Sequence, residues 1–240
     1  MEAYFKGKKF IVTGANAGIG ETITNRLVGL GAHVFAVGRD PAKLPPASPN
    51  LTPVCADVGK WEAYETIKAL GPVDGLVNNA GVAYIESFLD MTQEGWDNTL
   101  NINSRGIVRI SQAVAKNMID AKIKGSIVNV SSTISERAIP DHTSYCASKG
   151  AVNQVTRVMS IELGPYGIRT NNVNPTVVMT KMGAKAWSDP EKSDPILKRI
   201  PLGRFAETDD VANVTLFLLS DYATYVNGVS IPVDGGFLTG

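Results

Sequence analysis

Short apolar runs alternate with longer segments of helical periodicity along almost the whole chain. The short runs are rich in valine and isoleucine, which is typical of buried strands. We expect strands over residues 9–13, 33–37, 52–55, 75–78, 126–131, 168–173 and 229–233. We expect helices from Ile19, from Trp61, from Thr92 or Glu94, from about Ser144, and over residues 207–219. Apolar strands with helices between them indicate an α/β fold, with a parallel sheet of about seven strands covered by helices on both faces.

Two segments interrupt this alternation. Residues 41–53 contain five prolines and are predicted to form a loop. Residues 176–201 are the longest candidate insertion, in which Ser188 or Asp189 is suited to cap a short helix. Such an insertion is either a lid over a pocket or an ordinary surface excursion. We expect one domain over residues 1–240 with a substrate lid around 176–201.

Composition narrows the class of protein. The chain has 240 residues, 44% of them hydrophobic and 19% charged, which suits one compact domain with a sizeable core. A net charge of zero argues against nucleic acid or acidic membranes as partners. We find no apolar signal region or membrane-spanning run, and the two cysteines, Cys55 and Cys146, suggest neither a disulfide framework nor a metal site. A reducing, cytoplasmic setting is the expectation.

A glycine-rich turn follows the first predicted strand and leads directly into the first long helix. Its glycines are spaced Gly-x-x-x-Gly-x-Gly. Glycines allow a tight turn and a close backbone approach to a pyrophosphate, and the N-terminus of the helix offers free N–H groups. We therefore predict a dinucleotide site that includes Gly14, Asn16, Gly18, Ile19 and Gly20.

The end of the second strand indicates which dinucleotide binds. A carboxylate is expected there for NAD, but the chain reads Val-Gly-Arg-Asp over residues 37–40. Gly38 leaves space, and Arg39 is suited to pair with a 2′-phosphate, which favours NADP(H). Asp40 lies close by, and Ala17 stands where a second cation would help. The alternative is that Arg39 is an ordinary surface residue.

Two later strand ends complete the predicted cofactor site. Asp57 is suited to accept a hydrogen bond from the adenine amino group, with the N–H of Val58 beside it. Asn79, Ala80 and Gly81 are small or polar and allow a backbone to lie against the cofactor. Asn79, or Asn78 before it, has a structural alternative, which is to tie neighbouring strands together.

Candidate chemistry lies where the fifth predicted strand meets the longest helix. Tyr145 and Lys149 are four residues apart and share a helix face, so we expect an ammonium that lowers the pKa of a phenol. Ser132 ends the preceding strand region and is placed to hold a substrate oxygen against that phenol. The spacing alone is weak evidence, because two other tyrosines, at positions 4 and 64, also have a lysine four residues on.

These motifs together resemble the short-chain dehydrogenase/reductase family, from about Gly7 to Gly236. The resemblance rests on residues 13–20, 78–81, Asn103, Ser132 with Tyr-Cys-Ala-Ser-Lys over 145–149, and residues 174–180. It implies a Rossmann-like, doubly wound fold and, as in most of the family, a homotetramer.

The resemblance also implies roles for individual residues. Tyr145 would protonate the substrate oxygen, and Lys149 would hold the nicotinamide ribose and lower the pKa of the phenol. Ser132 would hydrogen-bond the carbonyl, and Asn103 would anchor a water that relays protons to Lys149. The nicotinamide carboxamide would be contacted by Pro175, Val178 and Thr180.

Within the family, several stretches are most similar to reductases of keto sugars and small dicarbonyls, namely residues 71–74, 186–190, 199–203, 217–221 and 232–237. That likeness implies that Ser132, Thr133, His142, Tyr145 and Trp187 bind substrate. The expected function is NADPH-dependent carbonyl reduction, without metal. The alternatives are another ketone or alcohol as substrate or, from a different class, a catalytically idle cofactor-binding scaffold.

Overall fold

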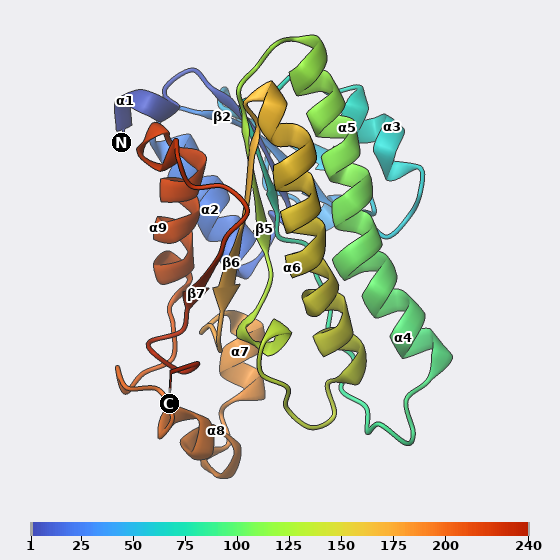
Figure 1. Ribbon diagram of the computed structural model, residues 1–240, viewed down its shortest axis with the longest axis vertical. Helices are drawn as coiled ribbons and strands as arrows, with labels where there is room; N and C mark the ends of the chain where they lie inside the picture. Colours follow the sequence, from blue (N-terminus) through green and yellow to red (C-terminus); the bar gives the residue numbers. More distant parts are fainter. Residues whose placement is uncertain (1, 240) are drawn as a thin grey trace.

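The computed structural model describes residues 2–239, over which seven parallel strands form one sheet (Figure 1). Residues 1 and 240 of the expected domain lie outside the described residues. The order of the strands across the sheet is β3-β2-β1-β4-β5-β6-β7. The strands are β1 (Lys9–Thr13), β2 (His33–Gly38), β3 (Leu51–Cys55), β4 (Gly75–Asn78), β5 (Ser126–Val130), β6 (Arg169–Pro175) and β7 (Ser230–Val233). The predicted α/β fold with one parallel sheet is confirmed.

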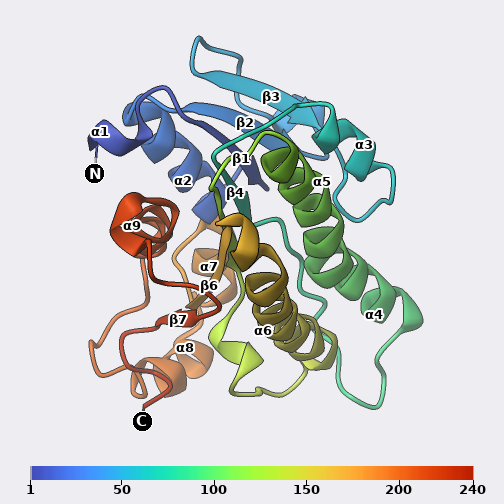
Figure 2. The ribbon, with the colours of Figure 1, turned by 45° about the horizontal axis from the view of Figure 1, so that its top comes forward.

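Helices cover both faces of the sheet, as the view in Figure 2 shows. α2 and α9 pack on one face, and α3, α5 and α6 lie on the other. The helices are α1 (Glu2–Phe5), α2 (Gly18–Gly29), α3 (Ala63–Lys68), α4 (Gln93–Leu100), α5 (Gly106–Asp120), α6 (Thr143–Leu163), α7 (Lys181–Ala186), α8 (Pro190–Leu197) and α9 (Thr208–Leu219).

The two faces of the sheet build two hydrophobic cores. Alternate residues of β1 illustrate the division, because Phe10 and Val12 belong to the α2–α9 side and Ile11 to the α3–α5 side. All three side chains are fully buried. Successive residues of a strand point to opposite faces, so an uninterrupted apolar run supplies both cores at once.

The structure corrects the sequence-based boundaries in two places. Residues 52 and 53 fell within both the predicted loop (41–53) and a predicted strand (52–55), and the structure places both in β3, where Pro53 pairs with Ala36 of β2. The sheet tolerates this proline because β3 is an edge strand, where a missing N–H leaves no neighbour without a partner. The helix expected from Thr92 or Glu94 begins at Gln93 and continues through a π-helical stretch, η2 (Asn101–Arg105), into α5.

The order of the strands reverses between β1 and β4, and this reversal places the first part of the site. The chain leaves β1 into the glycine turn on one side and leaves β4 into residues 79–81 on the other. Thr13 connects the two segments, since its Oγ1 accepts hydrogen bonds from the N–H groups of Asn79 (3.0 Å) and Ala80 (3.1 Å). Ligands of open parallel sheets bind at such a reversal, beyond the carboxyl ends of the strands.

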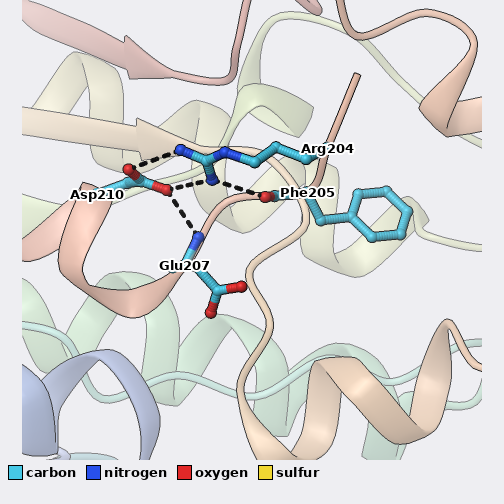
Figure 3. Close-up of polar contacts among 4 residues, drawn as sticks. All are labelled: Arg204, Phe205, Glu207 and Asp210. Atoms are coloured by element: carbon cyan, nitrogen blue, oxygen red, sulfur yellow. Dashed lines mark hydrogen bonds and ion pairs between the residues drawn. The ribbon is translucent and has the colours of Figure 1, made fainter. Parts of the chain in front are cut away.

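The insertion after β6 has a small core of its own. Ile200, Phe205 and Phe237 are buried in it, and Trp187 packs against them. Arg204 ties the end of the insertion to α9, because it donates to both carboxylate oxygens of Asp210 (2.7 and 3.1 Å) and to the Phe205 carbonyl (3.0 Å) (Figure 3). The Phe205 ring points away from this ion pair, as Figure 3 shows.

Candidate active site

The glycine turn packs directly against the end of β4. Gly14 has a φ of +65°, and a Cβ there would lie 2.9 Å from the side-chain nitrogen of Asn79. A Cβ on Gly20 would overlap the carbonyl oxygen of Gly14. Asn79 occupies the space that these glycines leave, and it donates to the carbonyls of Thr13 (3.1 Å) and Gly14 (3.2 Å). The glycines therefore allow the turn to close on the sheet.

A cavity of about 510 Å³ opens beyond this turn. Its size is within the usual range for a cofactor pocket. Eight of the predicted cofactor residues line it: Gly14, Asn16, Arg39, Asp57, Val58, Asn79, Ala80 and Gly81. The Asp57 side chain stabilises the turn in which it lies, because its Oδ1 accepts a hydrogen bond from the N–H of Gly59 (3.0 Å). The carboxyl ends of β1, β2, β3 and β4 therefore meet at this one cavity.

The other predicted cofactor residues do not line this cavity in the described part of the chain. Gly18 begins α2, and Ile19 packs against the core beneath it. Thr180 caps α7 by accepting from the N–H of Gly183 (3.0 Å), and its methyl group would lie 2.8 Å from a Cβ on Gly18. The first residues of the insertion therefore touch the glycine turn, while Pro175, Val178 and Gly20 lie deeper.

Three charged side chains lie at the end of β2 and in the loop that follows it, beside the cavity. Arg39 is exposed at the cavity wall. Asp40 is turned to its own loop, where it accepts from the N–H of Ala42 (3.1 Å) and pairs with Lys43 (3.1 Å). The hydrogen bond from Lys43 holds the pKa of Asp40 below its ordinary value. The carboxylate is thus already engaged, and Lys43 adds a second cation to the wall of the cavity.

Lys149 is buried between the end of β5 and the ring of Tyr145. Its side chain is 3% exposed, and its Nζ donates to the carbonyl of Val130 (2.7 Å). The same Nζ lies 5.6 Å from the centroid of the Tyr145 ring. The structure therefore brings the predicted ammonium and phenol together, and it adds an anchor for the lysine that the sequence did not reveal.

The expected lowering of the phenol pKa is wrong for the protein alone. Burial raises the pKa of Tyr145 to about 12, while a hydrogen bond with Ser132 acts in the opposite direction. Burial also lowers the pKa of Lys149 to about 8. The reason is that a poorly solvated site disfavours the charged form of both groups.

Asn103 is fully buried in η2 and joins two segments of the site. Its side-chain oxygen accepts from the N–H of Val82 (2.9 Å), and its nitrogen donates to the Val82 carbonyl (2.8 Å) and to Ser148 Oγ (3.1 Å). Ser148 lies beside Lys149 on α6, so the amide connects the β4 exit with the helix of the tyrosine. The water relay through Asn103 stays a prediction.

Tyr145 lines a second cavity, of about 180 Å³. The five predicted substrate residues all line it: Ser132, Thr133, His142, Tyr145 and Trp187. The rings of His142 and Tyr145 are 6.4 Å apart, and His142 Nδ1 lies 2.7 Å from the carbonyl oxygen of Pro140. Trp187 is held by the ring of Phe205 at 6.0 Å.

Sequence reasoning missed the C-terminal wall of this second cavity. Arg137 and Phe237 both line it, and the Arg137 guanidinium lies 5.2 Å from the Phe237 ring and donates to its carbonyl (3.2 Å). These residues are 100 positions apart. In the sequence, Phe237 is visible only as an apolar residue directly after the final glycine pair. A pattern of strands and helices does not show that this residue lies near Tyr145.

Other kinds of site are not found in the part of the chain that the structure describes. Over residues 2–239 no group of histidine, cysteine, aspartate or glutamate residues is arranged to hold a metal ion. Cys55 and Cys146 are both free thiols. None of the described helices is both long and apolar enough to cross a membrane.

Fold and site together define an oxidoreductase with a dinucleotide cavity beside a serine–tyrosine–lysine group. A family model described as enoyl-(acyl carrier protein) reductase matches residues 14–238. The chain belongs to the short-chain dehydrogenase/reductase family.

Named relatives are similar over almost the whole chain. L-xylulose reductase of Homo sapiens is 48% identical over 241 residues, which is 99% of each protein. Carbonyl reductase [NADPH] 2 of Sus scrofa is 46% identical over 99% of each protein. Among solved structures, a putative NAD(P)-dependent gluconate 5-dehydrogenase from Beutenbergia cavernae, with NADP bound at low occupancy, has a TM-score of 0.94 at 31% identity and full coverage of both chains.

Proposed function

We propose that this protein is an NADPH-dependent carbonyl reductase that converts L-xylulose to xylitol and also reduces small dicarbonyls. The observation that carries the proposal is the substrate cavity, in which Ser132 and Tyr145 face His142 and Trp187. The 48% identity to human L-xylulose reductase supports the choice of sugar.

The residues of the chain divide the work of reduction between them. A nicotinamide cofactor held in the cavity beyond the glycine turn would supply the hydride for the carbonyl carbon. Tyr145 gives its proton to the carbonyl oxygen, and Ser132 donates a hydrogen bond to the same oxygen as negative charge develops there. Lys149 holds the nicotinamide ribose and stabilises the phenolate that remains.

The pKa of the phenol explains why this arrangement needs more than the protein. With a pKa of about 12, Tyr145 keeps its proton at neutral pH, but it gives that proton up less readily than an acid with a pKa near neutrality. A hydrogen bond with Ser132 acts toward a lower pKa of the phenol. A charged ammonium at Lys149, whose Nζ lies 5.6 Å from the ring centroid, would act in the same direction. Positive charge at the cofactor site would lower the pKa of the Tyr145 phenol further, in addition to the effects of the protein's own groups.

We assign the 2′-phosphate of the cofactor to Arg39, with Lys43 beside it. The support is that both cations line the 510 Å³ cavity, while Asp40 is bonded within its own loop. Asp57 and Val58 are assigned to the adenine. Residues 79–81 and the glycine turn are assigned to the sugar–pyrophosphate part, and the segment from Pro175 to Thr180 to the carboxamide.

Assembly and setting are part of the same proposal. We propose a homotetramer, supported by apolar side chains on the outer side of α6, where Val158 is 52% and Ile161 75% exposed. A cytoplasmic setting is supported by the two free thiols, Cys55 and Cys146. Residues 176–201 are proposed as a lid, since Trp187 and Ile196 of this insertion line the substrate cavity.

A substrate panel tests the proposal. NADPH oxidation is measured with L-xylulose, diacetyl and a steroid ketone, and each is repeated with NADH. We expect turnover of L-xylulose and diacetyl with a preference for NADPH. Activity on the steroid alone would reject the sugar assignment in favour of another ketone, and no activity on any carbonyl would favour an idle scaffold.

A further inference from the structure

A continuous series of buried amide and hydroxyl side chains crosses the sheet beneath the site. It begins where Asn78 of β4 donates to Asn129 of β5 (2.8 Å). Asn129 in turn donates to Thr156 of α6 (2.7 Å), and Thr156 donates to Asn172 of β6 (2.6 Å). All four side chains are at most 2% exposed. Burial of polar groups so deep in a core is costly unless each has a hydrogen-bond partner, and in this series the side chains are partners of one another.

The series ends at the catalytic serine. Asn172 donates to Asn153 Oδ1 (3.1 Å), and Asn153 Nδ2 donates to Ser135 Oγ (2.9 Å). The hydroxyl of Ser135 then donates to the backbone carbonyl of Ser132. Asn174 donates to the same hydroxyl (3.2 Å).

The hydrogen-bonding capacity of the Ser135 hydroxyl is fully used in this arrangement. A serine hydroxyl has one proton to donate and two lone pairs to accept with. Its proton goes to Ser132, and its lone pairs receive Asn153 and Asn174. The amide of Asn153 is fixed as well, because its oxygen is taken by Asn172 and only its nitrogen is left for Ser135.

These bonds join the two elements on which the reaction depends. Ser132 and Ser135 belong to one turn, in which the 3₁₀ helix η3 (Thr133–Ser135) follows Ser132. Asn153 lies on α6, about two helical turns beyond Tyr145. The bond between Asn153 and Ser135 therefore sets the distance between the serine turn and the helix that carries the phenol and the ammonium.

We propose that Ser135 and Asn153 are positioning residues, which hold the Ser132 hydroxyl against the phenol of Tyr145 through the Asn153–Ser135–Ser132 hydrogen bonds. This inference rests on the proposed function, since it gives Ser132 the task of holding the substrate oxygen. A displacement of the serine by a fraction of an ångström weakens its bonds to both the phenol and the substrate.

The first test compares two serine-to-alanine changes on either side of the same strand. Ser135→Ala should lower kcat for L-xylulose by about 10- to 100-fold and leave the Kd for NADPH unchanged. Ser126→Ala is the matched control, because Ser126 is 1% exposed and bonds the Leu218 carbonyl (2.9 Å) at the opposite end of β5. Ser135→Thr keeps the hydroxyl and should restore most of kcat. An equal loss in Ser126→Ala would overturn the proposal.

The second test asks whether Ser135 acts through Ser132. In a Ser132→Ala background, adding Ser135→Ala should cost less than about twofold further, because the group it positions is gone. The basic limb of the pH profile for reduction should also move to higher pH in Ser135→Ala, since the hydrogen bond from Ser132 favours the phenolate.

The outcomes separate this inference from the proposed function. A Ser132→Ala enzyme with full turnover would remove the catalytic role of Ser132 itself. A Ser132→Ala enzyme with low turnover, in which Ser135→Ala costs its full factor again, would show that Ser135 acts by some other route and would overturn the inference alone. Asn153→Leu should repeat the Ser135→Ala pattern, and it supplies a second, independent variant.

Discussion

Two tyrosine–lysine pairs in this chain have the same spacing and nearly the same local geometry. In α3 the Nζ of Lys68 lies 5.8 Å from the ring centroid of Tyr64, and in α6 the Nζ of Lys149 lies 5.6 Å from that of Tyr145. Lys68 is exposed, whereas Lys149 is 3% exposed and bonded to the Val130 carbonyl. Tyr145 and Ser132 line the 180 Å³ cavity, whereas neither Tyr64 nor Lys68 lines either of the two cavities described above.

The difference teaches that spacing brings two groups together but does not make them reactive. An i, i+4 pair meets on any helix. A shift in the pKa of either group requires removal from water and fixed partners, and these come from the strand end and the loops packed around α6. The chemistry therefore belongs to the tertiary arrangement rather than to the helix.

Breaking the buried pair should have the largest effect. Tyr145→Phe removes the only acid that touches the substrate oxygen in the proposed mechanism, so kcat for L-xylulose should fall by about 1,000-fold or more. The Kd for NADPH, measured by fluorescence titration, should change by less than about twofold, because the phenol acts on the substrate.

Tyr64→Phe is the matched control for this change. It removes the same hydroxyl from the exposed pair and should leave kcat within about twofold of the wild-type value. Comparable losses in the two variants, or retained turnover in Tyr145→Phe, would contradict the assignment of Tyr145.

Much of the fold follows from the alternation of apolar and polar positions. β1 and β4 have the predicted bounds, and the other strands differ by one or two residues at one end or, for β6, at both ends. Pro53 was included in both a predicted loop and a predicted strand, because a proline marks a loop unless the strand is an edge, and strand order is not a local property. The short helices α1, α7 and α8 were not delimited, since four to eight residues give little periodicity.

The site was predicted less completely, for a physical reason. Residues that carry motifs, such as Gly14 and Lys149, could be identified because their roles depend on local spacing. Lys43, Arg137 and Phe237 reach the two cavities only through packing. In the protein alone the pKa of Tyr145 shifts upward instead of downward, because desolvation depends on everything around the phenol, which no local pattern records.

Burial of Lys149 should be measurable as a pH-dependent loss of stability. The pKa of its ammonium falls from 10.5 to about 8 on folding, a change of about 3 kcal/mol. This penalty is fully present below pH 8 and disappears as the pH rises toward 10.5, since the folded state loses its proton first. Lys149→Met should therefore unfold at a higher temperature than the wild type at pH 7. The margin, which is the difference between the two unfolding temperatures, should shrink between pH 8 and 10.

Thermal unfolding of the two proteins over that pH range tests this expectation. The loss of the hydrogen bond to Val130 reduces the stabilisation of Lys149→Met by about 1 kcal/mol. The change of the margin with pH is therefore a more reliable signal than its size at one pH. Lys68→Met is the control for loss of a lysine from the exposed pair. A margin for Lys149→Met that is constant from pH 7 to 10 would show that the ammonium is not desolvated.

The smallest effect is expected at Lys43, a lysine that acts from the surface. Its side chain is 71% exposed, so salt screens its contribution to binding of a 2′-phosphate. Lys43→Ala should weaken binding of adenosine 2′,5′-bisphosphate about three- to tenfold at low salt and much less at 0.5 M salt, with binding of 5′-AMP unchanged. Arg39→Ala should cost more, because its planar guanidinium bonds a phosphate in two places. If Lys43→Ala weakened both nucleotides equally, Lys43 would be a general electrostatic contributor and the 2′-phosphate would belong to Arg39 alone.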